Sequence, residues 1–245
     1  MSVIVVTGAS RGIGAAIACA LAEAGHIVGC LSRSGTLPAM PAGDSAVQSR
    51  LRPLQADVTQ PQEIRRALGE LVEAVGPLTG LVNNAGIHEE SRSEEMSREQ
   101  WDAVMTSNAF SAVLCCQAAY PHLLEAGGGL IVNIGSFFDK LGVKRNLAYC
   151  ASKAAVGAIT RVLAVEWARA AIRVLDVAPG YVLTDLNQDS LQKGPLKAYL
   201  DGRIPLRRTA RAEEIGALVA LLFNAGNSFM TGETLYVDGG QGIAH

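Results

Sequence analysis

The sequence predicts a doubly wound α/β domain built on a parallel sheet. Three observations predict it: short runs of β-branched and aliphatic residues recur, stretches with helical periodicity lie between them, and the intervals leave room for parallel crossovers. Alternating strands and helices are typical of a sheet covered by helices on both faces. The 245 residues suit a single domain over residues 1–245, without an internal repeat or linker.

Each element can be placed from these patterns. Buried parallel strands are expected at residues 3–6, 27–31, 81–83, 130–134, 173–177 and 234–237. Helices are expected around Ile13, Ile17 and Leu21, and over residues 101–124, 151–170 and 212–223. Prolines and glycines in segment 35–49 predict a loop or a broken helix. The polar segment 183–203 is expected to be a substrate loop, with an ordinary surface loop as the alternative.

Composition and charge argue against several classes of function. A net charge of -2 without a long basic run makes nucleic acid an improbable partner and favours a small-molecule substrate. No apolar stretch is expected to reach the roughly 20 residues that span a bilayer, and no cleavable leader is recognised, so we expect a cytoplasmic protein without membrane contact. Neither disulfides nor a metal site are expected. The five cysteines include no CxxC pair, and ordinary structural or surface roles are expected for His26, His88, His122 and His245.

The glycine-rich turn after the first strand predicts a dinucleotide-binding site. Residues 7–14, TGASRGIG, follow the strand VIVV and open an alanine-rich helix. Gly8 would permit a tight turn, Gly12 would let the backbone approach a pyrophosphate, and Gly14 would let the helix pack closely on the sheet. The phosphates would then meet a helix N-terminus. Glycine clusters also make plain strand-to-helix turns, but the flanking strand and helix favour a Rossmann-type fold.

The end of the second strand favours NADP(H) over NAD(H). An acidic residue there would bind the ribose hydroxyls and repel a 2′-phosphate. This chain has Ser32, Arg33 and Ser34 instead, and Arg11 lies in the glycine turn. Two guanidinium groups favour a phosphate. The alternative is that both arginines are solvated surface residues.

Tyr149 and Lys153 are candidates for proton transfer. They are four residues apart, so on a helix they project from one face. A free tyrosine ionises at about pH 10, and a neighbouring ammonium group is expected to lower that pKa. In the direction of reduction, Tyr149 would protonate the developing alkoxide while hydride from the nicotinamide reaches the carbonyl carbon. Taken alone, a tyrosine and a lysine at this spacing could be a surface pair.

The order of the motifs resembles the classical short-chain dehydrogenase/reductase family along nearly the whole chain. The matching motifs are residues 7–14, Asp57 and Val58 after a third strand, NNAG at 83–86, Asn108, Ser136, YCASK at 149–153, Pro179 and Gly180, Thr184, and GETLYVDGG at 232–240. The resemblance implies that Ser136 holds the carbonyl oxygen, that Lys153 binds the nicotinamide ribose, and that Asn108 positions a water connecting the lysine to solvent. The implied catalytic residues are Asn108, Ser136, Tyr149 and Lys153. The implied cofactor-binding residues are Gly8, Ser10, Arg11, Gly12, Ile13, Gly14, Ser32, Arg33, Asp57, Val58, Asn84, Ala85, Gly86, Tyr149, Lys153, Pro179, Gly180, Val182 and Thr184.

Within this family the chain looks most similar to bacterial 3-oxoacyl thioester reductases of fatty acid metabolism, through NNAGI at 83–87, VAPG at 177–180 and IPLRR at 204–208. A 3-oxoacyl thioester is therefore the expected substrate, with sugars, polyols or other ketones and alcohols as the alternative and a noncatalytic NADPH-binding sensor as a second one. Residues 121–129, PHLLEAGGG, replace a basic cluster common in acyl-carrier-protein reductases, which puts docking of that carrier in doubt.

Two further departures from the family pattern stand out. Segment 88–98 is strongly charged and could reshape the substrate mouth, and Asp176 occupies a place where the family often has asparagine. The resemblance also implies a homotetramer, or a homodimer, that packs through the helices carrying Asn108 and Tyr149. The apolar residues on those helices could equally belong to the core: they are Phe110, Val113, Leu114, Val156, Ile159, Val162 and Leu163.

Overall fold

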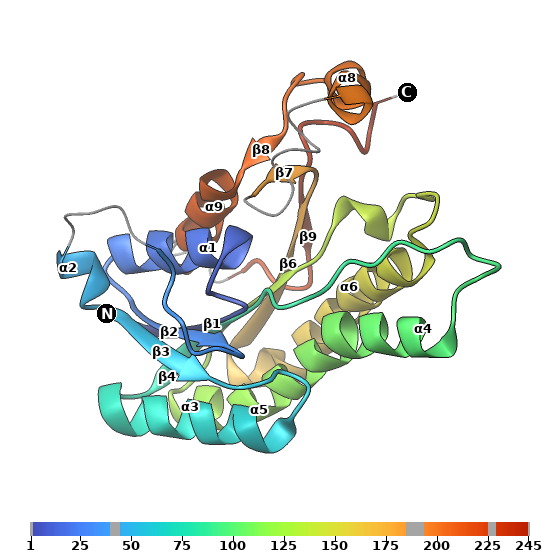
Figure 1. The fold of residues 1–245 in the computed structure, drawn as a ribbon. Helices are drawn as coiled ribbons and strands as arrows, with labels where there is room; N and C mark the ends of the chain where they lie inside the picture. The colour runs from blue at the N-terminus through green and yellow to red at the C-terminus, as the bar shows by residue number, and fades with distance from the viewer. Residues whose placement is uncertain (1, 40–44, 185–193, 225–228, 245) are drawn as a thin grey trace.

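The computed structural model describes residues 2–39, 45–184, 194–224 and 229–244, and its centre is a seven-stranded parallel sheet with helices on both faces (Figure 1). The strand order is β3-β2-β1-β4-β5-β6-β9. The order reverses between β1 and β4, and in such sheets a ligand binds beyond the carboxyl ends of the strands at this point. The predicted doubly wound, Rossmann-type sheet is confirmed.

All six predicted strand segments fall within strands of this sheet. The strands are β1 (Val3–Thr7), β2 (Ile27–Ser32), β3 (Leu51–Gln55), β4 (Leu78–Asn83), β5 (Gly129–Ile134), β6 (Ile172–Pro179) and β9 (Thr234–Val237). Strand β3 was not among the predicted runs because its sequence, LRPLQ, contains a proline and an arginine. An edge strand tolerates proline, and Pro53 pairs with Cys30 of β2 on one side only.

Two groups of helices cover the sheet (Figure 1). One face carries α1 (Gly12–Glu23), α2 (Ser45–Gln48) and α9 (Ala212–Asn224), and the other carries α3 (Pro61–Val75), α5 (Ser111–Glu125) and α6 (Leu147–Trp167). Helix α3 was also not singled out from the sequence. It begins with Pro61 at its first turn and buries Ile64, Ala67, Leu68 and Leu71 on one face.

The helix expected over residues 101–124 is present as a continuous helical run, but it contains a π-helical turn that the sequence did not predict. The chain forms α4 (Arg98–Met105), a π-helical turn η1 (Thr106–Phe110) and then α5. Helix α4 starts at a capping box, in which Ser97 accepts from the backbone of Gln100 and the Gln100 side chain accepts from the backbone of Ser97. The wide turn lies at Asn108, and π-helical turns of this kind occur frequently at functional sites.

The loop expected over residues 183–203 is partly helical. Residues 185–193 lie outside the described part of the chain, and α8 (Gly194–Arg203) follows them. Before this segment β7 (Val182–Leu183) pairs in parallel with β8 (Ala210–Arg211), and the buried Leu200 and Ile204 pack near Tyr181 and Leu183. The other expected loop, 35–49, ends in the short helix α2, and residues 40–44 of it lie outside the described residues.

The expectation that no apolar stretch reaches membrane-spanning length is also wrong. Helix α6 and the 3-10 turn η3 (Ala168–Ala170) run continuously over 24 residues that are long and apolar enough to cross a bilayer. The core helix of a soluble protein passes the same test. Here Val156, Gly157 and Thr160 are buried against the sheet, so this helix forms part of the α/β core.

Candidate active site

A cleft of about 920 Å³ contains almost all of the predicted site. Its lining runs from the glycine turn and the end of β2, past the NNAG turn, to α6 and the turn after β6. Every residue predicted to bind the cofactor lines it, and so does every predicted catalytic residue except Asn108. Segments from the two halves of the sheet therefore meet in one hollow.

The glycine turn has the geometry that a bound pyrophosphate requires. Gly8 and Gly12 have φ angles of 66° and 58°, which only glycine adopts without strain. A Cβ on Gly14 would lie 2.3 Å from the carbonyl oxygen of Gly8, so the first turn of α1 packs directly on the loop. No side chain caps the N-terminus of α1 at Arg11, which leaves that positive end facing the cleft. These features fit a dinucleotide phosphate.

Hydrogen bonds from the NNAG turn fix the ends of β1 and β4 beside each other. The hydroxyl oxygen of Thr7 accepts from the backbone nitrogens of Asn84 (2.9 Å) and Ala85 (3.0 Å). The Asn84 amide donates back to the carbonyl oxygen of Thr7 at 3.0 Å. The backbone on both sides of the switch point is thus held in position without ligand.

The adenosine end of the cleft is rich in donors and positive charge. Arg11 and Arg33 are exposed and line it, and the buried Ser32 hydroxyl lies 3.4 Å from that of Ser34. Asp57 accepts from the backbone nitrogen and the hydroxyl of Thr59, both at 2.8 Å. These hydrogen bonds lower the pKa of Asp57, with a smaller contribution from Arg33.

Tyr149 and Lys153 both point into the cleft from the first half of α6, and Ser136 lies opposite at the end of β5. The Lys153 ammonium donates to the carbonyl oxygen of Ile134 at 2.8 Å. Burial lowers the pKa of Lys153 to about 8, while the charge of Asp176 raises it. These contacts hold the ammonium group at a defined point behind the tyrosine ring.

The expectation that Lys153 lowers the pKa of Tyr149 does not hold in this structure. Burial raises the pKa of Tyr149, and hydrogen bonding by Ser136 offsets only part of that rise. The ammonium nitrogen of Lys153 lies 5.7 Å from the ring centre, and burial is the largest influence on this pKa. Tyr149 is therefore a protonated donor at neutral pH.

Asn108 stands behind the cleft rather than in it. The π-helical turn directs its amide to the NNAG turn, where its oxygen accepts from the Ile87 nitrogen (2.7 Å) and its nitrogen donates to the Ile87 carbonyl oxygen (2.9 Å). The same nitrogen donates to the Ser152 hydroxyl at 3.1 Å. Within the described residues no hydrogen bond joins Asn108 to Lys153, so the direct contacts support a role in fixing the turn against α6.

Several residues that line the cleft were not predicted as site residues. His88, expected in an ordinary role, is exposed in the cleft with its ring edge-on to Tyr149 (centroids 4.8 Å apart), and its Nε2 hydrogen-bonds the buried Asn146 amide oxygen. Phe138 packs edge-on to the same tyrosine at 5.9 Å and to Tyr181 at 6.0 Å. The position of His88 two residues after the NNAG turn was the available signal. Phe138 and Tyr181 come together beside Tyr149 only through tertiary packing, so no pattern in the sequence indicated them.

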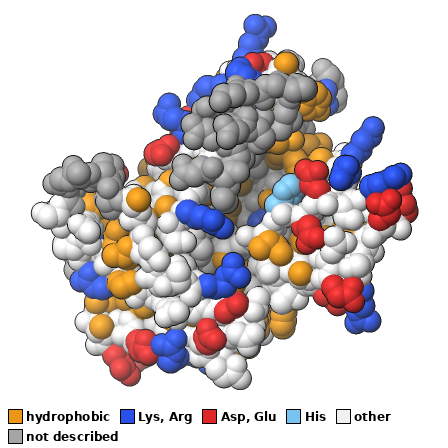
Figure 2. Space-filling model, in the orientation of Figure 1, with side chains coloured by type: hydrophobic (Ala, Val, Ile, Leu, Met, Phe, Trp, Pro, Cys, Tyr) orange, Lys and Arg blue, Asp and Glu red, His pale blue; other side chains and the backbone are white. Residues whose placement is uncertain are grey.

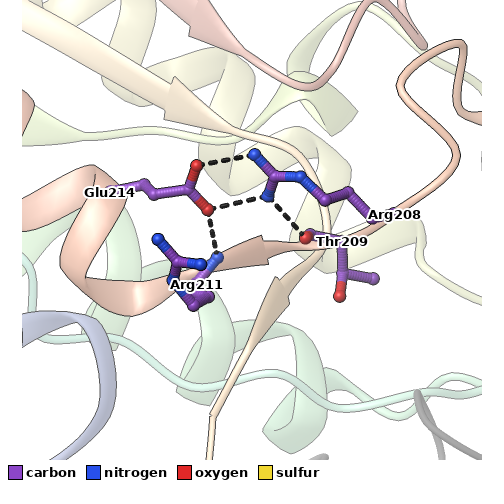
Figure 3. Close-up of polar contacts among 4 residues, drawn as sticks. All are labelled: Arg208, Thr209, Arg211 and Glu214. Atoms are coloured by element: carbon purple, nitrogen blue, oxygen red, sulfur yellow. Dashed lines mark hydrogen bonds and ion pairs between the residues drawn. The ribbon is translucent and has the colours of Figure 1, made fainter.

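An ion pair outside the cleft supports the strand next to it (Figure 3). The Arg208 guanidinium donates to both carboxylate oxygens of Glu214, at 2.7 and 2.8 Å, and Glu214 also accepts from the Arg211 backbone nitrogen at 2.9 Å. These contacts join the IPLRR segment and β8 to the first turn of α9. Because β8 pairs with β7, they also support the segment that carries Val182.

Comparisons with known proteins agree with this architecture. The profile of the family described as enoyl-(acyl carrier protein) reductase matches residues 8–241. The chain is 35% identical to the D-threitol dehydrogenase of Mycolicibacterium smegmatis over 98% of this chain and 93% of that protein. It is 34% identical to a 3-oxoacyl-(acyl-carrier-protein) reductase of Staphylococcus aureus over 96% of each.

A solved structure is similar over the full chain. The gluconate 5-dehydrogenase of Burkholderia cenocepacia, determined in complex with NADP and tartrate, has a TM-score of 0.89 and 29% identity, covering 100% of this chain and 96% of its own. The relatives act on different substrates but share one fold over almost their whole length. The chain therefore belongs to the classical short-chain dehydrogenase/reductase family, and is an oxidoreductase that acts on alcohol and carbonyl groups.

Proposed function

We propose that this protein uses NADP(H) to interconvert a ketone and a secondary alcohol, with reduction as its main direction in the cell. The observation that carries the proposal is the convergence of Ser136, Tyr149 and Lys153 in one cleft with an uncapped glycine turn. A complete set of proton-handling groups argues against a noncatalytic sensor, which needs only the nucleotide end of the cleft.

The chain's own residues account for the proton and for orientation. When bound, nicotinamide would provide the hydride that reduces the carbonyl carbon. The Ser136 hydroxyl orients the carbonyl oxygen, and Tyr149 donates its phenolic proton to that oxygen as negative charge develops there. The raised pKa of Tyr149 keeps that proton in place until the alkoxide forms. Lys153, anchored on the Ile134 carbonyl, binds the ribose and stabilises the phenolate left behind.

The proposed preference for NADP(H) rests on the adenosine end of the cleft. Arg11 and Arg33 approach it from the glycine turn and from the end of β2, and Ser32 adds a hydroxyl. No acidic side chain occupies the end of β2 to bind the ribose hydroxyls. The gluconate 5-dehydrogenase of Burkholderia cenocepacia, which has the same fold, was determined in complex with NADP, and this supports the proposal.

For the substrate we propose a 3-oxoacyl thioester carried by coenzyme A or a similar small group. The wall beside Tyr149 is formed by Phe137, Phe138 and Tyr181, which suits an apolar acyl chain. A free acyl carrier protein is not favoured. Arg145 pairs with the cleft residue Glu90 at 3.7 Å, and Arg92 pairs with Glu94 at 2.7 Å, so each of these basic side chains already has an acidic partner. Figure 2 shows basic and acidic side chains intermixed on this side of the molecule.

A polyol or sugar is the second candidate, and one observation favours it. His88 and Glu90 place polar groups at the mouth of the cleft, where they can bind substrate hydroxyls. The D-threitol dehydrogenase and the gluconate 5-dehydrogenase among the relatives are named for such substrates.

We also propose a single domain that assembles as a homotetramer, with α8, from the described part of the predicted substrate loop at residues 183–203, bordering the substrate. The apolar side chains of the helical segments that carry Asn108 and Tyr149 divide into a buried set and an exposed set. Leu114 and Val156 are buried in the core, whereas Phe110 and Val162 are 55% and 54% exposed. An exposed apolar surface on these helices suits contact with a second copy.

The test is the absorbance change of the nicotinamide band with NADPH or NADH and one of three substrates: a short 3-oxoacyl thioester, a ketose, or an apolar ketone. Oxidation selective for NADPH with the thioester supports the full proposal. Turnover confined to the ketose moves the substrate to the second candidate. Tight NADPH binding without turnover on any ketone, or on the corresponding alcohols with NADP, contradicts the proposed activity.

A further inference from the structure

Two charged side chains lie inside the protein close to the active site. Among the aspartates, glutamates, lysines and arginines that the structure describes, only Lys153 and Asp176 are buried, with 6% and 0% of their surfaces exposed. Burying a charge is costly unless an opposite charge or hydrogen bonds compensate it. Lys153 belongs to the proposed catalytic set, whereas Asp176 has no part in that mechanism.

Asp176 lies against the peptide unit that anchors Lys153. It sits on β6 opposite Asn133 of β5, so its side chain borders the end of β5. A Cβ on Gly135 would lie 2.5 Å from its Oδ1, and one on Gly157 would lie 3.9 Å from its Oδ2. The nitrogen of Gly135 is bonded to the Ile134 carbonyl carbon, whose oxygen accepts from Lys153. The carboxylate therefore occupies space that two glycines leave open beside the lysine.

The surroundings of Asp176 leave it short of partners. Its Oδ2 accepts from the Thr234 hydroxyl at 3.1 Å, and its buried Oδ1 has no hydrogen-bond partner among the described residues. The ionisable groups around it include one carboxylate, Asp139, which accepts from the Tyr236 hydroxyl at 2.7 Å. The cations of this region are Lys153 on α6, Arg161 one turn beyond Gly157, and Lys140, whose ammonium lies 3.4 Å above the Tyr236 ring.

We propose that Asp176 is a positioning residue that keeps Lys153 protonated from behind the active site. The inference rests on the proposed function, because it assigns a partner to a residue of that mechanism. No direct ion pair joins the two described side chains, so the effect is an electrostatic attraction across the Ile134–Gly135 peptide in a region of low dielectric constant. An asparagine in this place would supply hydrogen bonds without the charge.

The pKa values of the two groups agree with this arrangement. Burial, with a smaller effect of Asp139, raises the pKa of Asp176 to about 6, against the opposing effects of Thr234, Lys153 and the Gly135 backbone nitrogen. Burial lowers the pKa of Lys153 to about 8, against the opposing effect of Asp176. Both groups are therefore charged between about pH 6 and pH 8, the range in which the lysine has its counter-charge.

The first test is Asp176→Asn, which changes one atom and removes the charge. Lys153 should lose its proton at lower pH, so the basic limb of the kcat/KM profile for reduction should move down by about one pH unit. A readout independent of activity is thermal unfolding of the protein without added nucleotide. Asp176 has a raised pKa, so the natural chain loses stability as pH rises from about 4 to 6. The melting temperature of Asp176→Asn relative to the natural chain should rise over that interval.

Two matched variants separate charge from structure. Thr234→Val keeps the Asp176 carboxylate but removes the hydroxyl that donates to it. The basic limb of the kcat/KM profile should therefore stay in place. The pH-dependent loss of stability should extend to higher pH, because the pKa of Asp176 rises further without this donor. Asp102→Asn removes an exposed carboxylate on α4 and should alter neither readout. An unchanged basic limb in an active Asp176→Asn variant would overturn the proposal, and so would a difference in melting temperature that does not depend on pH, because Asp176 would then not titrate between about pH 4 and pH 6.

This outcome differs from failure of the proposed function. If the natural chain turns over no ketone or alcohol, the proposed function fails, and the stability readout still tests the titration of Asp176. If the natural chain is active and its basic limb is unmoved in Asp176→Asn, only the inference about Asp176 fails.

Discussion

The ammonium nitrogen of Lys153 lies 5.7 Å from the ring centre of Tyr149, one helical turn away on α6. The spacing in sequence predicted this approach, and α6 produces it by projecting both residues from one face. The ammonium group is directed to the Ile134 carbonyl rather than to the phenolic oxygen. Burial raises the pKa of Tyr149, so the tyrosine keeps its proton at neutral pH, which suits an acid in carbonyl reduction.

Tyr149→Phe should abolish turnover while NADPH binding stays nearly intact. The substitution removes the proton donor, and general acid catalysis is worth roughly a hundredfold or more in rate. Turnover is measured by nicotinamide absorbance and binding by NADPH fluorescence. The control is Tyr120→Phe, because Tyr120 lies on α5 and packs against Trp167, away from the cleft. Turnover retained in Tyr149→Phe would contradict the assigned role.

Arg33→Asp should shift the preference from NADPH toward NADH. The change removes a guanidinium from the end of β2 and places there a carboxylate that repels a 2′-phosphate and binds ribose hydroxyls. Loss of one charged hydrogen bond is worth about 1.5 kcal/mol or more, so the ratio of the two kcat/KM values should fall at least roughly tenfold.

The matched control for that charge reversal is Arg65→Asp. Arg65 is exposed on α3, outside the cleft lining, so its reversal should leave the cofactor ratio unchanged. An unchanged NADPH to NADH ratio in Arg33→Asp would mean that Arg33 is a solvated surface residue.

His88→Leu should distinguish between the two substrate classes. It removes the polar ring beside Tyr149 while keeping an apolar side chain there. If His88 binds substrate hydroxyls, KM for a polyol should rise about tenfold and KM for an acyl thioester should change little. The control is His122→Leu on α5. An equal fall in kcat with both substrates would instead assign His88 to the support of Tyr149.

Gly14→Ala should weaken both folding and NADPH binding. The added Cβ would lie 2.3 Å from the Gly8 carbonyl oxygen and 2.4 Å from the Asn84 amide nitrogen, so the glycine turn must shift. Overpacking of this kind costs about 1–3 kcal/mol. Gly69→Ala is the control, since nothing lies within 4 Å of its added Cβ on α3, and it should stabilise the helix. Equal melting temperatures for the two variants would contradict the packing argument.

The sequence predicted what depends on local motifs and missed what depends on packing. The glycine turn, the alternation of elements and the spacing of Tyr149 and Lys153 are local, and each appears where it was expected. The π-helical turn at Asn108 was missed because helical periodicity does not reveal one inserted residue. Strand β3 was absent from the predicted hydrophobic runs, and only the family resemblance implied a strand before Asp57, because the edge position that makes Pro53 acceptable follows from the strand order.

The sequence predicted which residues form the site better than it predicted their chemical properties. A neighbouring lysine predicted a lowered pKa for Tyr149, but burial acts in the opposite sense and has the larger effect. His88 was set aside because histidines scattered in sequence carry no ligand spacing, yet the turn after β4 places it against the catalytic helix. Burial and tertiary neighbours decide both points, and neither can be read from spacing.

Glu214→Gln should lower the stability of the fold in a pH-dependent way. The Arg208 guanidinium holds the pKa of Glu214 down to about 2, so this carboxylate stabilises the folded state fully above its ordinary pKa, and the contribution is lost as pH falls through about 2. Because the Arg208 and Glu214 side chains are 52% and 31% exposed, solvent screening reduces the effect to about 1 kcal/mol. Urea unfolding at pH 7 and at successively lower pH measures it.

The difference in unfolding free energy between the natural chain and Glu214→Gln should be largest near neutral pH and shrink as the solution becomes strongly acidic. Glu213→Gln removes the same charge from the same first turn of α9, without the contacts to Arg208 and Arg211, and should show a much smaller difference. Because β8 pairs with β7, loss of the Glu214 contacts should also raise the Kd for NADPH at the Val182 segment. A variant with unchanged stability and unchanged NADPH affinity would show that the pair, although bidentate, is too well solvated to hold β8 in place.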